Sequence, residues 1–298
     1  KSALARYTPA DFIAMVDRHA IAYHEKALGQ LFCDDSSKQI VRMLLDECAA
    51  ADVRIETGCR IERVERGEDG FTLDTARGVF VVPALVIASG GLSIPSMGAS
   101  GFGYDSARLC CHNVLPTRAA LVPLTLSGRH QERLVDLAGV ALQVEARCNG
   151  VHFRNSMLLT HRGISGPAIL QISSYWNPGH DLRLNLLPDD DAFEWLFAQR
   201  AERPAAELRS VLAERIPKRF AQRLCEHWLT SKPMRQYPDA KLHEVADLLA
   251  NWPLVASGTE GYRTAFFVLR PVGTYRIASR TMQSTRIPGP YFIGEIVD

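Results

Sequence analysis

The densest group of residues suited to hold a flat or charged ligand is the stretch ASGGLSIPSMGASGFGYDSA, from Ala88 to Ala107. Glycine has no side chain, so the backbone at such positions can come close to a ligand. Gly101-Phe102-Gly103 precedes a predicted helix, and the amide groups at a helix start can face an anion. A plain loop between a strand and a helix has a similar composition, because glycine motifs match widely. The stretch alone leaves both interpretations open.

The second candidate is YFIGEIVD, at the end of the chain. The apolar run Tyr291–Ile293 predicts a buried strand, and Gly294 lets the backbone after it pass close to a ligand. Glu295 and Asp298 then supply two carboxylates. An ionised carboxylate is a strong hydrogen-bond acceptor, so either residue is a candidate ligand contact. Asp298 is equally suited to cap a helix.

Histidine supplies the candidate for proton transfer. His161, in THRGISGP, is suited to act as a general acid, although a turn histidine with backbone partners fits the same pattern. Arg162 beside it either grips an anion or is solvated. His24 is a weaker candidate. We find no nucleophile elbow, P-loop or metal-ligand cluster, and we predict no metal site.

Composition excludes several classes of protein. The chain has 298 residues, of which 47% are hydrophobic and 22% are charged, as in ordinary globular proteins. With a formal net charge of +1, the protein as a whole has no strong electrostatic attraction to nucleic acid or to anionic membranes. No apolar run reaches the roughly 18 residues of a membrane helix. The seven scattered cysteines indicate reduced thiols and a cytoplasmic location.

The chain divides by its patterns into four parts. Helices are predicted after Thr8 and after Ser36 or Ser37, the second with Ile40, Val41, Leu44 and Leu45 on one face. Predicted strands follow at residues 53–56, 60–66, 71–74, 79–82 and 85–88, the last apolar enough for a buried parallel sheet. Residues 116–188 are rich in strand patterns and predict a small barrel or sandwich, whereas residues 189–255 are helical. Strand character returns in residues 256–298.

The fold expected from this order is an α/β domain with a two-part insertion. Residues 1–115 and 256–298 would form the α/β domain, residues 116–188 a β-barrel-like insert and residues 189–255 a helical insert. Residues 291–293 would then lie beside the strand at residues 85–88.

Four blocks of the chain resemble the YhiN-like flavoproteins, also described as BaiN-type NAD(P)/FAD-dependent oxidoreductases. The blocks are HEKALGQLFC, VIASGGLSIPSMGASGFGYDSA, LLTHRGISGPAILQISSYW and SRTMQSTRIPGPYFIGEIVD. The resemblance implies a Rossmann-like FAD domain of the two-dinucleotide-binding type with a β-meander. It also implies a G-x-G-x-x-G unit before Lys1 and further sequence after Asp298. We therefore expect an internal fragment that binds FAD poorly and is inactive by itself.

The same resemblance assigns roles to residues around FAD. Ile61 would face the adenine, and Ala88-Ser89-Gly90-Gly91 would lie beside the adenosine and pyrophosphate. Ser93, Pro95, Gly98 and Gly101 would shape the ring pocket. Glu295, after Gly294, would bind the ribityl hydroxyls, with Asp298 as the alternative. The sequence departs from the family pattern at Pro271 and Tyr275, so the resemblance assigns no flavin contact from Val268 to Thr274.

Three functions remain open. The leading hypothesis is an oxidoreductase that uses NAD(P)H and FAD to reduce an activated C=C bond of a small molecule. The alternative is an RNA-modifying flavoenzyme that reduces uracil to dihydrouracil. A mildly basic segment, residues 215–241, would then contact RNA, with Phe220, Trp228 and Tyr237 stacking on bases; an amphipathic helical face has the same pattern. The third is a non-catalytic binding module. Oligomeric state is not indicated by the sequence.

Overall fold

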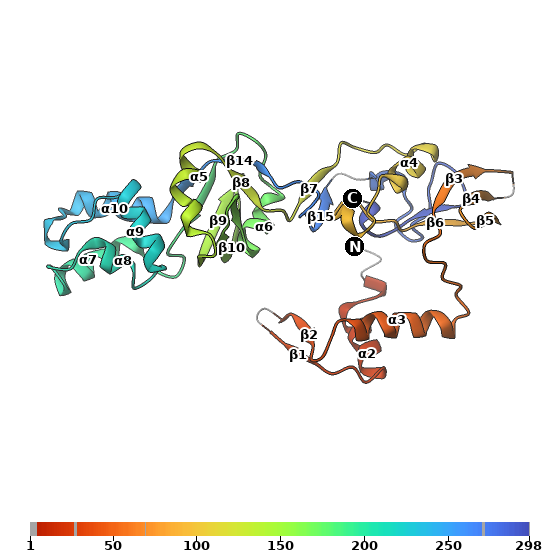
Figure 1. Ribbon diagram of the computed structural model, residues 1–298, viewed down its shortest axis with the longest axis horizontal. Coiled ribbons are helices and arrows are strands. Elements are labelled where there is room, and N and C mark those ends of the chain that lie inside the picture. Colours follow the sequence, from red (N-terminus) through yellow and green to blue (C-terminus); the bar gives the residue numbers. More distant parts are fainter. Residues whose placement is uncertain (1–4, 27–28, 69, 270–271, 298) are drawn as a thin grey trace. The chain divides into compact units, whose positions relative to one another are not determined.

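The computed structural model describes residues 5–26, 29–68, 70–269 and 272–297 (Figure 1). The chain forms two compact units. The first comprises Lys1–Ile87 and Thr274–Ile293, and the second comprises Ala88–Gly273 and Gly294–Asp298. Asp298 and Pro271, which the sequence analysis singled out, lie outside the described residues.

The first unit begins with helices and a hairpin. Helix α2 (Pro9–Arg18) starts at Thr8, whose side chain and that of Asp11 form a reciprocal capping box, as predicted. Strands β1 (Tyr23–Glu25) and β2 (Leu31–Cys33) pair antiparallel. Helix α3 (Lys38–Ala50) has Ser37 at its N-cap. The predicted apolar face of α3 was wrong: Met43 is buried, whereas Val41, Leu44 and Leu45 are exposed.

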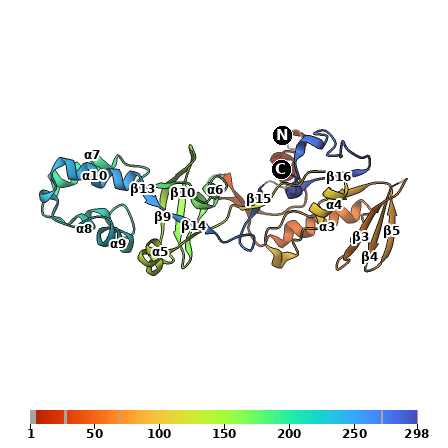
Figure 2. The ribbon, with the colours of Figure 1, turned by 90° about the horizontal axis from the view of Figure 1, so that it is seen from above.

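A three-stranded meander follows (Figure 2). Strands β3 (Ile61–Arg66), β4 (Phe71–Thr75) and β5 (Gly78–Val82) pair antiparallel in sequence order. These elements match the predicted strands and hairpin. The strand predicted at residues 53–56 is absent, and the chain is irregular there. Its apolar residues Val53 and Ile55 are exposed, so the alternation in the sequence did not reflect a buried face.

The two sequence-distant parts of the first unit meet in one strand pair. Strand β6 (Leu85–Ile87) pairs in parallel with β16 (Pro290–Phe292), and Val86 is opposite Tyr291. Phe292 is fully buried. This pairing confirms that the apolar run near the end of the chain lies beside the strand that precedes the glycine-rich stretch.

The second unit contains a seven-stranded antiparallel sheet. Its order is β13-β12-β9-β10-β11-β8-β14. The two edge strands, β13 (Trp252–Leu254) and β14 (Ala256–Thr259), are separated only by Val255, so one bent segment joins the two edges and the sheet is barrel-like. The other strands are β8 (Leu124–Leu126), β9 (Ala141–Cys148), β10 (Val151–Leu159), β11 (Gly163–Ser165) and β12 (Leu182–Asn185). Helices α5 (Gly128–Leu134) and α6 (Pro167–Ser173) and the 3-10 turn η3 (Val135–Leu137) lie between strands.

Between β12 and β13 the chain forms a helical part, visible in Figure 1 as the group α7 to α10. Its elements are α7 (Ala192–Glu202), α8 (Leu208–Leu212), α9 (Lys218–His227), the 3-10 turn η4 (Met234–Gln236) and α10 (Asp239–Ala250). Asp191 caps α7 by accepting from the amides of Phe193 and Glu194. Pro217 and Pro238 occupy the N-cap positions of α9 and α10. One hydrophobic core continues from the sheet into these helices.

Short elements hold the remainder of the second unit. The glycine-rich stretch contains the 3-10 turn η2 (Pro95–Met97) and leads into α4 (Phe102–Leu109). Strands β7 (Arg118–Ala120) and β15 (Phe267–Leu269) form a separate antiparallel pair. The 3-10 turn η6 (Gly294–Ile296) directly follows β16, whereas η5 (Thr274–Arg276) belongs to the first unit. Among the described residues from 262 to 272, β15 is the one strand, and Val272 forms isolated bridges.

The fold is therefore mixed α/β with a barrel-like and a helical part. The Rossmann-like FAD domain and the four domain boundaries stay predictions. Across the described residues, no helix has the length and apolar character needed to cross a membrane. The same residues contain no group of three or more histidine, cysteine, aspartate or glutamate side chains arranged to hold a metal ion.

Candidate functional site

Glu295 lies at the centre of the candidate site. Its Oε1 atom accepts a hydrogen bond from the backbone N–H of Val268 at 3.0 Å. The same oxygen accepts from the Ser93 hydroxyl at 3.3 Å. The carboxylate thus joins the glycine-rich stretch to β15. We call Gly90, Gly91, Ser93, Tyr104, Val268 and Glu295 the Glu295 cluster.

Local backbone structure explains how Glu295 reaches both partners. Gly294 has φ = +72°, a conformation that favours glycine, and it turns the chain into η6 directly after β16. The carbonyl of Ile296 accepts from the Val272 amide at 3.0 Å, which fixes this turn. Among the described strands, β15 pairs with β7 alone, so its outer edge has a backbone N–H available for the carboxylate.

The glycines of the cluster provide close approach. Gly90 has φ = +69°, and a Cβ atom added there would lie 3.9 Å from Glu295 Oε2. A Cβ atom at Gly91 would lie 2.7 Å from Val268 Cγ2 and 3.1 Å from the Tyr104 hydroxyl. At Gly103 it would overlap the Ser89 hydroxyl. The glycine-rich stretch is therefore tightly packed at Gly91 and Gly103.

Tyr104, on α4, is a functional candidate that sequence reasoning missed. Its side chain is buried with 3% exposure, and its hydroxyl has no hydrogen-bond partner among the described residues. Burial, then the charge of Glu295, then Tyr262 raise the pKa of Tyr104 to about 12. The hydroxyl is consequently protonated at neutral pH and can donate. Its sequence signal, an aromatic residue in a short helix, does not differ from that of a core residue.

A hollow of about 440 Å³ lies on the same helix. Its lining includes Leu92, Gly101, Tyr104, Asp105 and Thr117. The Thr117 hydroxyl is bonded to that of Tyr262 at 2.8 Å. The size is within the range of about 300–1,000 Å³ typical of small-molecule sites.

The other predicted contacts of the glycine-rich stretch are mostly at the surface. Ala88 and Ser89 are exposed, as are Pro95, on η2, and Gly98, which ends it with φ = +95°. Gly101 is the N-cap of α4 and has no capping side chain. Ile61 belongs to the first unit, where it begins β3 and is half-buried. The roles assigned to these residues stay predictions.

His161 is exposed in the turn between β10 and β11. The side chain of Thr160 shapes this turn by accepting from the amides of Arg162, at 3.3 Å, and Gly163, at 3.1 Å. Among the described residues, no hydrogen bond or ion pair links His161 to the Glu295 cluster. Its role as a general acid therefore stays a prediction.

The aromatic residues that the RNA hypothesis would place against bases pack against the hydrophobic core. Phe220 is fully buried and Tyr237 is 7% exposed, and both belong to the hydrophobic core. Trp228 packs against that core and lies edge-on to Trp252. Burial therefore excludes base stacking by Phe220 and Tyr237. It agrees with the other interpretation of this segment, in which the aromatic residues pack inward.

A family model described as "HI0933-like protein barrel and H2TH domain" matches residues 118–267. A ribosomal RNA dihydrouridine synthase of Escherichia coli strain K12 is 48% identical over the whole chain, which covers 75% of that protein. A protein with the same name from Haemophilus influenzae is 39% identical over the whole chain and is covered to 76%. The chain belongs to the HI0933-like family.

A more distant relative of this HI0933-like chain is a 3-dehydro-bile acid delta(4,6)-reductase of Clostridium scindens. It is 26% identical over 89% of the chain, and 68% of it is covered. The resemblance drawn from the four sequence blocks is thus confirmed at the level of the family. The family model spans the seven-stranded sheet and the helices α5 to α10, in agreement with the predicted barrel-like and helical parts. Within the Glu295 cluster, every residue lies outside the matched range.

Proposed function

We propose that this protein reduces uracil to dihydrouracil in ribosomal RNA, with FAD as its cofactor and NAD(P)H as electron donor. The observation that carries the proposal is the 48% identity, over the whole chain, to a ribosomal RNA dihydrouridine synthase. The leading hypothesis from the sequence was a small-molecule ene reductase. It has weaker support, because the bile acid reductase is only 26% identical.

The two hypotheses share one kind of chemistry. Reduction of uracil adds a hydride and a proton across the C5=C6 bond, and NAD(P)H becomes NAD(P)⁺. Bound FAD would supply the two-electron transfer between the nicotinamide and the pyrimidine. The protein must bind both partners, orient them and supply the proton.

The Glu295 cluster has features that suit FAD. Oε2 of Glu295 accepts no hydrogen bond within the described part of the chain, so this carboxylate oxygen remains available to ligand hydroxyls. The buried Tyr104 hydroxyl is an unsatisfied donor in the same cluster. Because Gly90 has no side chain, the space between its backbone and Oε2 of Glu295 stays open to a ligand. Residues 1–115 and 256–298 would form the FAD-binding domain, and His161 would donate the proton.

The test is an RNA reduction assay. The full-length protein, loaded with FAD, would be incubated with NADH or NADPH and ribosomal RNA that has not been modified at the target base. Digested nucleosides are then analysed by mass spectrometry. We expect dihydrouridine to form only when enzyme, RNA and nicotinamide are all present. A bile acid enone is the comparison substrate, and faster turnover of the enone with no dihydrouridine in RNA would reject the proposal.

A further inference from the structure

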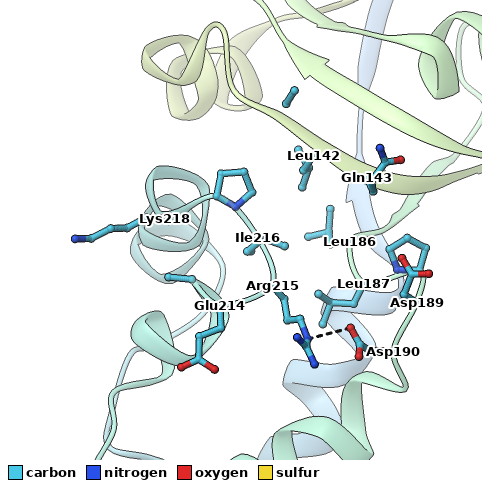
Figure 3. Close-up of a pocket in the computed structure, with 14 residues that line it drawn as sticks. Leu142, Gln143, Leu186, Leu187, Asp189, Asp190, Glu214, Arg215, Ile216 and Lys218 are labelled. Carbon is cyan, nitrogen blue, oxygen red and sulfur yellow. Dashed lines mark ion pairs between the residues drawn. The ribbon is translucent and has the colours of Figure 1, made fainter. Parts of the chain in front are cut away.

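Two adjoining hollows lie on the second unit, where the seven-stranded sheet meets the helices. The first, of about 700 Å³, is shown in Figure 3 and has an apolar floor that includes Leu142, Leu186 and Ile216. The second, of about 350 Å³, is lined by Arg209, Ser210, Ala213, Lys218 and Gln222. We call the second hollow the Arg209 groove. Ala213 and Lys218 line both, so the two hollows share a wall.

Apart from Lys218, every charged side chain that lines the first hollow forms an ion pair. Arg215 pairs with Asp190 at 3.2 Å across its lower side in Figure 3. The remaining lining carboxylates, of Asp189 and Glu214, pair with arginines outside the lining, namely Arg154 and Arg203. The hollow therefore combines an apolar floor with a rim of neutralised ion pairs.

The Arg209 groove has an excess of positive charge. Its lining includes no acidic residue. Arg209 and Lys218 are exposed, and neither forms an ion pair with any residue that the structure describes. In Figure 3 the Lys218 side chain extends away from the apolar floor of the first hollow. The amide of Gln222 donates to Glu226 at 2.9 Å, which holds it along α9.

This pattern favours a polyanion with an uncharged part attached. A guanidinium can form a two-pronged hydrogen bond with phosphate, and a lysine acts as a point charge beside it. An apolar floor with neutral ion pairs suits a base and sugar better than a second phosphate. The carboxylates of an acidic peptide would also pair with the two cations. They would not bind favourably in the neutral, apolar hollow beside the groove.

We propose that the Arg209 groove binds a backbone phosphate of RNA and that the attached nucleoside lies over the hollow of Figure 3. The inference rests on the proposed function, because that function names RNA as the substrate. It places the RNA on α8 and α9, held by exposed cations, in place of the buried aromatic residues.

The first test measures the salt dependence of RNA binding. A fluorescein-labelled ribosomal RNA fragment is titrated with the protein at several salt concentrations, and binding is followed by anisotropy. The double variant Arg209→Ala/Lys218→Ala is compared with Lys38→Ala/Arg66→Ala, which removes the same charge from exposed positions outside both the groove and residues 215–241. We expect the groove variant to flatten the plot of log affinity against log salt by about 0.7, because one phosphate is no longer neutralised and each such phosphate contributes about 0.7 to the slope.

The second test changes charge at the shared wall. Ala213→Glu and Ala213→Gln add side chains of the same size to a half-buried position that lines both hollows. Repulsion of phosphate predicts that the glutamate variant binds RNA at least tenfold more weakly than the glutamine variant. Circular dichroism melting of both variants checks that the fold is retained.

The outcomes separate the groove from the proposed function. Equal losses in the groove variant and its charge-matched control, or a loss in neither, would overturn the groove as the RNA site. Tighter binding of a polyglutamate peptide than of RNA would also overturn it. If the groove variants weaken RNA binding while the wild-type enzyme forms no dihydrouridine, the groove stands and the proposed function fails.

Discussion

Ser93 and Glu295 lie 202 positions apart in the sequence and are joined by a hydrogen bond of 3.3 Å. The glutamate oxygen that accepts this bond also accepts from the Val268 amide. The carboxylate therefore stabilises the fold by joining Ser93 to Val268, in addition to any role in ligand binding. Substitutions of Glu295 must be assessed for stability and for cofactor binding separately.

Replacing Glu295 should lower both stability and FAD affinity. Val268 is fully buried, so Glu295→Ala leaves its N–H without an acceptor, and an unsatisfied buried donor costs about 1–3 kcal/mol. Glu295→Gln retains an oxygen acceptor and should lose less. Urea denaturation measures the first effect, and titration of the apoprotein with FAD measures the second. Ser93→Ala, which removes one donor only, is the control. If the alanine variant melts like the wild type and keeps its flavin, the cluster is not the site.

Gly91→Ala should destabilise the second unit. The new Cβ atom would lie 2.7 Å from Val268 Cγ2, closer than carbon atoms can pack, and overpacking of this kind costs about 1–3 kcal/mol. Combining it with Val268→Ala removes the contact at 2.7 Å and leaves the one at 3.0 Å to the Cβ atom of residue 268, so Gly91→Ala should cost less in that background. A double-mutant cycle of unfolding free energies tests this coupling. Additive costs would show that the strain lies elsewhere.

Tyr104→Phe removes a buried hydroxyl that has no protein partner among the described residues. Without ligand, the variant should be as stable as the wild type or more stable, because no hydrogen bond is broken and an unsatisfied polar group is removed. FAD affinity should fall if the hydroxyl donates to the cofactor. A variant that loses stability without FAD would show that the hydroxyl has an internal partner, such as a water molecule.

Tyr104 also predicts a pH effect at the alkaline end. Its pKa is raised from 10.0 to about 12 in the folded protein, so the folded state holds its proton more firmly than the unfolded state. The contribution of Tyr104 to the free energy of unfolding is fully present below pH 10 and is lost as the pH rises toward about 12. Tyr237, with a pKa raised to about 12, acts in the same direction. Tyr104→Phe should make the unfolding free energy fall less steeply between pH 10 and pH 12, measured by urea denaturation.

His161→Ala should slow reduction of RNA more than reduction of the flavin by NAD(P)H. A proton donor to the pyrimidine is needed only in the half-reaction that consumes the substrate. Stopped-flow absorbance measures the two half-reactions separately. Arg162→Ala, at the neighbouring exposed position, is the control. Equal slowing of both half-reactions by His161→Ala would exclude the acid role.

Local patterns in the sequence predicted the elements that depend on local chemistry. The cap at Thr8, the hairpin of β4 and β5 and the apolar strands β6 and β16 all follow from residue types and spacing. Contacts through backbone atoms were not predictable, because any residue at position 268 other than proline has the N–H that binds Glu295. Burial on a helix was not predictable either, since Val41, expected on the apolar face of α3, is exposed, whereas Met43 is buried.

The helical part leaves the sheet after Asn185 and returns at Trp252, which pairs with Leu184. The end of β12 and the start of β13 therefore lie side by side on two adjacent antiparallel strands. An excursion closed in this way can be lengthened, exchanged or removed without shifting the register of any strand. If this excursion binds the RNA, evolution can change which RNA is recognised while leaving the Glu295 cluster intact. Grafting residues 186–251 from a relative is a route to new target specificity that preserves the sheet.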